Sequence, residues 1–287
     1  MYNKVAVYGS RRQSPYLEGL RRLFLFLEER GFRVFVHDRF EAYLKGEGVD
    51  TGTSVSVENI PEGVSLVISI GGDGTFLRAA RWVGDRQIPI LGVNTGHLGY
   101  LAACGMEGFE ETFAEILRGE VDVEKRMLLK VECDALNPGT WRYALNEVTA
   151  RRDESASVIS IKTSLGGIPL ADYVADGLII STPTGSTAYN LSSGGPILEP
   201  TVGCFAITPI APHTLTLRPL VVADSSEIEM EVESRSGKFR LSLDDRAFTL
   251  YSGEKILIRK APFGVFIIRR KNSNFAKKLR EKLFWNS

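Results

Sequence analysis

The chain has 287 residues, 44% of them hydrophobic and 24% charged, which is ordinary for a globular protein and long enough for two domains. Lys and Arg together number 35, as do Asp and Glu, so the net charge is zero and gives no argument for a nucleic-acid partner or an anionic membrane surface. We expect neither. Three scattered cysteines without a CxxC pair argue against a disulfide framework or a zinc knuckle. The amino terminus lacks a signal-peptide pattern, and no apolar run reaches the ~20 residues of a membrane span. We therefore expect a cytoplasmic protein.

The first third of the chain alternates strand and helix patterns. Short apolar runs predict buried strands, and apolar residues spaced three and four apart predict helices. The expected elements are strands at 4–8, 32–36, 64–70 and 88–93, helices from Pro15 to Gly31, at 76–83 and at 109–117, and a Gly-rich loop at 45–63. Such βαβ units build parallel sheets.

The pattern changes near residue 120, where short segments rich in β-branched and aromatic residues begin. Strands are expected at 127–133, 141–145, 158–163, 178–181, 227–232, 239–243 and 255–259. Phe275, Leu279 and Leu283 are spaced four apart and predict a closing helix over 274–285. We therefore predict an α/β domain over residues 1–120, a β-rich domain over 121–264, and a C-terminal helix over 265–287 that docks back on the first domain.

The sequence GGDGT at Gly71–Thr75 follows a buried strand and precedes a helix. Ligands of open α/β sheets bind at the carboxyl ends of strands, and glycines at a helix start let phosphates approach backbone N–H groups. The segment is neither a P-loop nor a GxGxxG fingerprint. Asp73 has two interpretations: a turn residue with local hydrogen bonds, or a carboxylate that orients or deprotonates a hydroxyl attacking a phosphate.

Asp176–Pro196 is a second candidate segment, because five of the seven residues from Ser181 to Thr187 carry hydroxyl groups. Small hydroxyls, backbone amides and one aromatic suit a nucleotide, although a solvated linker has a similar composition. Asn146-Glu147, at the end of the predicted strand 141–145, are ordinary turn residues or site residues. His213 is a satisfied structural residue or a catalytic one.

Five segments, in this order, resemble the NAD kinase family. They are Gly71–Thr75, Asn94–Tyr100 (NTGHLGY), Leu145–Val148 (LNEV), Asp176–Pro196 and Pro212–Thr214 (PHT). Related lipid kinases and phosphofructokinases share the first motif, whereas the fourth is much more specific. The resemblance implies an N-terminal α/β, Rossmann-like domain, an all-β NAD-binding C-terminal domain, and an active site in the cleft between them.

The resemblance also implies residue roles. Asp73 matches the catalytic aspartate, Gly72 and Gly74 match the glycines that admit the donor phosphates, and Arg78 is placed to meet a phosphate. Asn146 and Glu147 match residues that bind the adenosine ribose of NAD. Asp176 and Ala188 match contacts to the nicotinamide end, and Tyr100, Thr187 and Tyr189 match contacts near the adenine. The remaining expected binding residues are Thr184, Asn190, Leu191, Ser192 and His213.

The implied reaction moves the γ-phosphoryl of ATP to the 2′-hydroxyl of the adenosine ribose of NAD, giving NADP and ADP. A divalent cation, Mg²⁺, is expected to be held mainly by ATP, with no metal ligands from the protein. The expected partners are small-molecule nucleotides and further copies of the chain, in a homodimer or homotetramer. Two alternatives remain: another GGDGT kinase, acting on a lipid or sugar phosphate, and a non-catalytic regulator that binds NAD(P).

Overall fold

The computed structural model describes residues 3–11, 13–96, 99–153, 158–271 and 273–283. The chain divides into two compact units. The first comprises Met1–Lys125 and Val265–Ser287, and the second comprises Arg126–Gly264. No helix in the described part of the chain is long and apolar enough to cross a membrane.

The first unit is a parallel sheet with helices on both faces. Its strands run in the order β3-β2-β1-β4-β5, and the end of β18 pairs with β5 on the far side. The strands are β1 (Lys4–Gly9), β2 (Arg33–His37), β3 (Val55–Val57), β4 (Leu66–Ile70), β5 (Ile90–Asn94), β6 (Cys104–Gly105) and the end of β18 (Lys255–Arg270). The helices are α1 (Leu17–Glu29), α2 (Asp38–Gly46), α3 (Asp73–Val83), α4 (Phe109–Arg118) and α6 (Phe275–Leu283).

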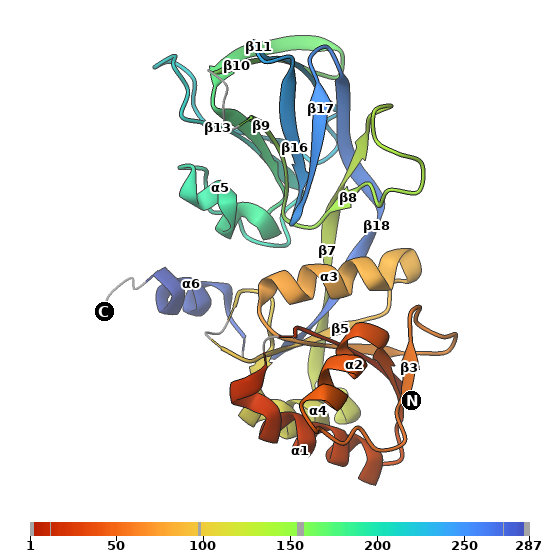
Figure 1. Cartoon of the computed structure of the whole chain (residues 1–287). Helices are drawn as coiled ribbons and strands as arrows, with labels where there is room; N and C mark the ends of the chain where they lie inside the picture. The colour runs from red at the N-terminus through yellow and green to blue at the C-terminus, as the bar shows by residue number, and fades with distance from the viewer. Residues whose placement is uncertain (1–2, 12, 97–98, 154–157, 272, 284–287) are drawn as a thin grey trace. The chain divides into compact units, whose positions relative to one another are not determined.

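Helices cover the central strands of this sheet from both sides. Every residue of β4 and β5 is buried, as expected for parallel strands between two helical layers. Figure 1 shows α1 and α4 on one face of the sheet and α3 on the other. Phe26 of α1 packs edge-on against Phe109 and Phe113 of α4, with ring centroids 5.5 and 5.7 Å apart. Burial of each such ring contributes roughly 1.5–3 kcal/mol, so these rings fix α4 against α1.

Two predictions about this unit are corrected. The predicted loop 45–63 is wrong in part, because Val55–Val57 form β3, which pairs in parallel with β2. This edge strand is short and largely exposed, so it leaves no apolar pattern in the sequence. The helix predicted from Phe76 begins at Asp73, because Gly72 is extended and the acidic residue favours the first helical turn.

The second unit consists of two antiparallel sheets. One has the order β11-β10-β15-β18, and the other has the order β14-β13-β12-β9-β16-β17. The strands are β7 (Val121–Glu132), β8 (Tyr143–Ala144), β9 (Glu147–Arg152), β10 (Ile159–Leu165), β11 (Ile168–Ala175), β12 (Gly177–Ser181), β13 (Cys204–Ile210), β14 (Leu220–Ala223), β15 (Ile228–Glu233), β16 (Lys238–Leu243), β17 (Arg246–Tyr251) and the first part of β18. The short helix α5 (Tyr189–Ser192) follows a 3₁₀ turn over Thr184–Thr187.

The alternating apolar residues of both sheets meet in one core. Met230 and Ile258 contribute from the first sheet, and Ile180, Phe205 and Leu241 from the second, all with no exposed surface. Figure 1 shows the strands of this unit layered over one another, with α5 beside them. Buried and exposed positions alternate along strands such as β15 and β16, as expected for strands with one face in a core.

Two further predictions are corrected. Asn146-Glu147 do not end a strand, because the expected strand 141–145 shrinks to the two-residue β8 and Glu147 begins β9. The C-terminal segment 265–287 is not helical throughout. Residues 265–270 end β18, where Ile267 pairs with Ile90 of β5, and the helix is Phe275–Leu283. The near-continuous burial of the end of β18 is typical of a parallel strand inside a sheet.

Candidate functional site

The Asp73 carboxylate is held in place by two backbone N–H groups. Asp73 is the first residue of α3, directly after β4 and the two glycines. Its Oδ2 accepts a hydrogen bond from Tyr100 N–H at 2.9 Å, and its Oδ1 accepts one from Leu101 N–H at 3.1 Å. The helix N-terminus also favours the negative charge. Each oxygen keeps a further lone pair, so the carboxylate is oriented and still able to accept a proton or hydrogen bond.

The positions around Asp73 that hold glycine differ in their geometry. Gly71 has φ +145°, and a Cβ there would lie 2.5 Å from Thr75 Oγ1. A Cβ on Gly99 would overlap the Asp73 carboxylate itself. Gly72 has open space where a Cβ would stand, and at Gly74 the nearest atom is a guanidinium nitrogen at 3.9 Å.

That guanidinium belongs to Arg78, one turn along α3. Its Nη2 donates to Thr75 Oγ1 at 3.3 Å. The start of α3 thus combines accessible glycine backbone, the N–H groups of a first helical turn and a nearby cation. This is a suitable environment for a phosphate.

Tyr100 has a buried hydroxyl oxygen without a hydrogen-bond partner among the described residues. Burial, and then the charge of Asp73, raise the pKa of Tyr100, so the phenol stays protonated at neutral pH. A ligand that offers an acceptor or donor would satisfy this oxygen. His97 and Leu98 of the same motif lie outside the described residues.

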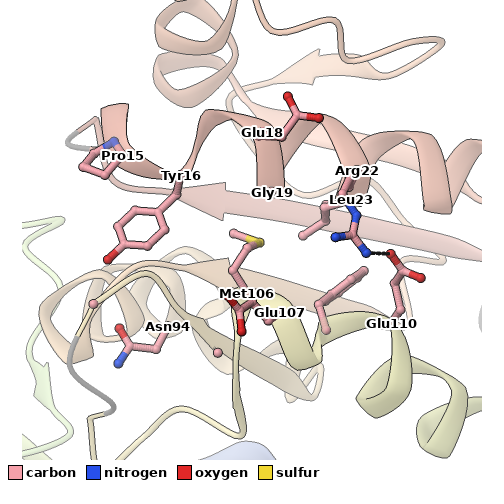
Figure 2. A pocket seen from close by; sticks show the side chains of 13 residues that line it. Pro15, Tyr16, Glu18, Gly19, Arg22, Leu23, Asn94, Met106, Glu107 and Glu110 are labelled. Atoms are coloured by element: carbon pink, nitrogen blue, oxygen red, sulfur yellow. Dashed lines mark hydrogen bonds and ion pairs between the residues drawn. The ribbon is translucent and has the colours of Figure 1, made fainter.

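A cavity of 460 Å³ lies beside the other end of this motif. Asn94 and Gly96 line it, together with residues from the starts of α1 and α4. Figure 2 shows Arg22 and Glu110 paired at its rim, with N and O 2.9 Å apart. Glu18 and Glu107 also line the cavity, so its acidic character disfavours phosphate.

In the second unit, the carboxylate of Asp244 organises the segment Leu145–Glu147. It accepts hydrogen bonds from Leu145 N–H and Asn146 N–H at 2.8 Å each, and from Glu147 N–H at 3.3 Å. Asp244 N–H donates back to the Glu147 carbonyl at 3.0 Å. Asp244 is therefore a structural support that sequence reasoning missed. The available signal was an Asp at a two-residue hairpin turn, where its φ of +52° is tolerated.

Glu147 is a carboxyl group that keeps its proton. Burial, and then the charge of Asp244, raise its pKa from 4.5 to about 8, while the Tyr189 N–H acts in the opposite direction. Its Oε2 is buried and has no partner within the described ranges. Burial also raises the pKa of Asp244, although three backbone N–H groups and Arg246 act in the opposite direction. The proton that Glu147 keeps at neutral pH is therefore available for donation to a ligand oxygen.

The hydroxyl-rich stretch uses most of its buried hydroxyls on the protein itself. Thr182 Oγ1 donates to the Leu145 carbonyl at 2.6 Å, and Ser186 Oγ donates to the Pro183 carbonyl at 2.7 Å. Thr184 Oγ1 accepts from Arg126 Nη1 at 3.1 Å. These contacts hold the turn in one shape, a role that composition alone did not indicate.

Asn190 is fully buried and has a similar supporting role. Its Nδ2 donates to the carbonyls of Ser186 and Pro196 at 3.2 and 3.0 Å, and its Oδ1 accepts from Thr208 Oγ1 at 2.7 Å. A Cβ on Gly195 would overlap this side chain. The predicted residues of this stretch that keep accessible surface are Thr187, Ala188, Tyr189, Leu191 and Ser192.

Asp176 directly precedes β12, and His213 lies three residues after β13, the strand that pairs with β12. Asp176 stands between β11 and β12 and forms an ion pair with Arg152 Nε at 2.8 Å. His213 is exposed, and its N–H donates to the Val174 carbonyl at 2.9 Å. The imidazole is therefore open to solvent or to a ligand.

Two protein families together match most of the chain. The family described as ATP-NAD kinase N-terminal domain matches residues 14–121, and the ATP-NAD kinase C-terminal domain matches residues 145–270. An NAD kinase of Bacteroides fragilis is 42% identical over 288 residues, covering 99% of this chain and 98% of its own length. The chain belongs to the NAD kinase family.

Further relatives agree with this assignment. An NAD kinase of Porphyromonas gingivalis is 42% identical over 286 residues, covering 99% of this chain and 98% of its own length. A yeast NADH kinase solved in complex with NADH has a TM-score of 0.87 and 25% identity, covering 99% of this chain and 88% of its own. An Archaeoglobus fulgidus NAD kinase in complex with ATP has a TM-score of 0.74 and 26% identity, covering 98% of both chains.

The predicted fold class is confirmed: an α/β first domain and a β-rich second domain form the NAD kinase fold. The roles of individual residues, and an active site in the cleft between the domains, stay predictions. Within the described ranges, no group of three or more His, Cys, Asp or Glu is arranged to hold a metal ion.

Proposed function

We propose that the chain transfers the γ-phosphoryl group of ATP to the 2′-hydroxyl of the adenosine ribose of NAD, giving NADP and ADP. Family membership over nearly the full length supports this reaction. The observation that carries it is the Asp73 carboxylate, oriented by two N–H groups at the open start of α3. The NADH and ATP complexes of two structural relatives support the nucleotide classes.

Asp73 is proposed to act on the acceptor hydroxyl. A ribose hydroxyl has a pKa far above 7 and is a weak nucleophile. A fixed carboxylate aligns it with the γ-phosphorus and takes its proton as the O–P bond forms, which contributes roughly 10²–10⁴ in rate. The two backbone bonds to Asp73 keep the carboxylate from rotating away, so alignment needs no further ordering.

The start of α3 is proposed to hold the donor phosphates. Gly72 and Gly74 leave the backbone accessible, and Arg78 lies close enough to neutralise developing negative charge. A divalent cation, Mg²⁺, would supply further neutralisation of the phosphate charge. Because the described residues offer no cluster of ligands, we propose that ATP oxygens and water hold this ion.

This arrangement predicts a dependence on divalent cation. EDTA in excess over Mg²⁺ is expected to lower the turnover number at least ~10-fold, because uncompensated phosphate charge repels the nucleophile. Restoring Mg²⁺ should recover the activity, and CD spectra should stay unchanged throughout. Full turnover in EDTA would contradict the proposal.

The second unit is proposed to bind NAD. Asn146 and Glu147 are assigned to the adenosine ribose, with the protonated Glu147 donating a hydrogen bond to a ligand oxygen. Asp176 and Ala188 are assigned to the nicotinamide end. Three aromatic or hydroxyl side chains are assigned to the adenine and its surroundings: Tyr100, Thr187 and Tyr189. The other proposed binding residues are Leu191, Ser192 and His213, while Thr184 and Asn190 are proposed to act by shaping the turn.

The acceptor identifies the reaction among kinases that share the GGDGT motif. Purified protein with γ-labelled ATP would be offered NAD, NADH, diacylglycerol, sphingosine and fructose 6-phosphate in parallel. We expect label transfer to the dinucleotides only. Transfer to a lipid or a sugar phosphate instead would show that the chain is a lipid kinase or a sugar-phosphate kinase. Binding of NAD without any transfer would favour a regulator.

Gly99 offers a test of the Asp73 geometry. In Gly99→Ala the new methyl group would overlap Asp73 Oδ1, so the carboxylate must move by about an ångström. We expect a kcat roughly 10- to 100-fold lower, since misplacement of that size disturbs alignment strongly. Gly105→Ala is the matched control, because its methyl group meets nothing within 4 Å. Equal kcat values for the two variants would contradict the assigned geometry.

We also propose a cytoplasmic location and, from the family resemblance, assembly into a homodimer or homotetramer.

A further inference from the structure

Residues 100–102 form the loop whose N–H groups bind Asp73. The carbonyl groups of the same loop contact the guanidinium group of Arg269. Arg269 lies near the end of β18 and is 7% exposed. Its Nη2 donates to the Tyr100 carbonyl at 2.9 Å, and its Nη1 lies 3.4 and 3.5 Å from the carbonyls of Ala102 and Leu101. The planar guanidinium presents its donors in a fixed fork, so it fixes several carbonyls in one arrangement.

One peptide plane connects Arg269 to Asp73. The Tyr100 carbonyl and the Leu101 N–H belong to the same planar unit. The carbonyl accepts from Arg269 at 2.9 Å, and the N–H donates to Asp73 Oδ1 at 3.1 Å. Because this unit is rigid, turning the carbonyl away from Arg269 also turns the N–H away from Asp73. Hydrogen bonds in series also polarise one another, so the cation strengthens the bond to the carboxylate.

The far end of the loop is anchored as well. A Cβ on Gly92 would lie 2.9 Å from Ala102 Cα, so the loop packs directly on β5. Ala103 N–H donates to the Gly92 carbonyl at 2.9 Å, and Lys278 Nζ donates to the Ala102 carbonyl at 3.2 Å. With one end fixed, the orientation of the peptide plane before Leu101 depends mainly on Arg269.

We infer that Arg269 is a positioning residue for Asp73, which fixes the N–H group that aims the carboxylate at the acceptor hydroxyl. The expected loss of kcat rests on the proposed function, whereas the expected release of the Leu101 N–H does not. Loss of the guanidinium should release the Leu101 N–H and lower kcat. Nucleotide binding should be retained, because Arg269 acts through the loop.

The next residue provides a matched control. Arg270 forms hydrogen bonds to Glu115 of α4, with Nε–Oε2 at 2.8 Å and Nη2–Oε1 at 2.6 Å. Arg269→Gln and Arg270→Gln therefore remove the same charge from adjacent positions of one strand. Arg269→Lys keeps the charge but loses the fork. Lys278→Met is a milder change at the same loop, since it removes one bond to the Ala102 carbonyl.

The experiment combines kinetics with amide hydrogen exchange on the full chain. We expect Arg269→Gln to lower kcat roughly 10- to 100-fold, with KM for NAD and ATP within about twofold of wild type. Arg269→Lys should recover part of that loss, and Lys278→Met should lose about two- to fivefold. Arg270→Gln should keep kcat within about twofold. Exchange at Leu101 N–H should be at least ~10-fold faster in the Arg269 variants only.

The two readouts separate this inference from the proposed function. If the wild type makes no NADP, exchange at Leu101 still tests the connection to Asp73. Unchanged exchange in both Arg269 variants would overturn the inference, as would a raised KM at normal kcat. Equal losses in Arg269→Gln and Arg270→Gln would show a general effect of lost stability and would also overturn it. If the Arg269 variants do not fold, normal kcat in Lys278→Met would count against the inference.

Discussion

Asp73→Asn is expected to lower kcat by about a thousandfold while the Kd for NAD changes by no more than about threefold. The asparagine side chain has the same shape but cannot accept a proton at neutral pH. Its NH₂ group would also face one of the two N–H groups of Tyr100 and Leu101, so one of these hydrogen bonds is lost. NAD binding should persist, because it is assigned to other residues.

Steady-state kinetics and calorimetric NAD titration would measure the two effects separately. Asp85→Asn is the control, because Asp85 is an exposed aspartate beyond the end of α3. It should behave as wild type in both measurements. A loss of NAD affinity as large as the loss of rate would contradict the proposed role of Asp73, because it would make this residue a binding group.

Glu147→Gln is expected to change how stability depends on pH. The Glu147 pKa is about 8 in the folded chain, against an ordinary value of 4.5. Below pH 4.5 the carboxyl is protonated in both the folded and the unfolded chain. Between pH 4.5 and 8 the folded chain keeps a proton that the unfolded chain releases, so the free energy of unfolding falls as pH rises. The fall is about 1.4 kcal/mol per pH unit, up to about 5 kcal/mol in total.

A glutamine side chain cannot ionise, so the Glu147→Gln variant should escape this fall. We expect its free energy of unfolding, relative to wild type, to be constant below pH 4.5 and to rise by several kcal/mol by pH 8. Urea unfolding at pH 4, 5, 6, 7 and 8 would measure the difference, and the lowest pH serves as the internal reference. A difference that stays flat across this range would show that Glu147 is ionised in the folded chain.

The sequence predicts the α/β part of the fold well where patterns are long and continuous. The buried strand before Gly71 and the apolar stripe of α1 both appear where the periodicity places them. Composition does not predict the short edge strand β3 or the limits of the two-residue β8, because pairing with a neighbouring strand defines both. The predicted C-terminal helix includes the end of β18, whereas this segment is a strand that pairs with β5 in the first sheet.

In the candidate site, the sequence predicts residues that lie in motifs but not the residues that support them from distant positions in the chain. Motifs identify Asp73 and Glu147, which stand next to recognisable glycines or strands. Asp244 and Arg269 support those two residues from 97 and 196 positions along the chain. Their partners are backbone N–H and carbonyl groups, which leave no trace in the identity of the contacted residues. A hairpin turn marks the position of Asp244 in the sequence, but the folded geometry is needed to show which groups Asp244 and Arg269 hold.

The central claim is that this chain makes NADP with Asp73 as the residue that activates the hydroxyl. Purified protein, NAD, ATP and Mg²⁺ would be mixed, with NADP measured by an NADP-specific dehydrogenase and ADP by a separate coupled reaction. We predict equal amounts of NADP and ADP from the wild type and almost none from Asp73→Asn. A folded wild-type protein that binds NAD but forms no NADP, or an Asp73→Asn variant with full activity, would contradict the claim.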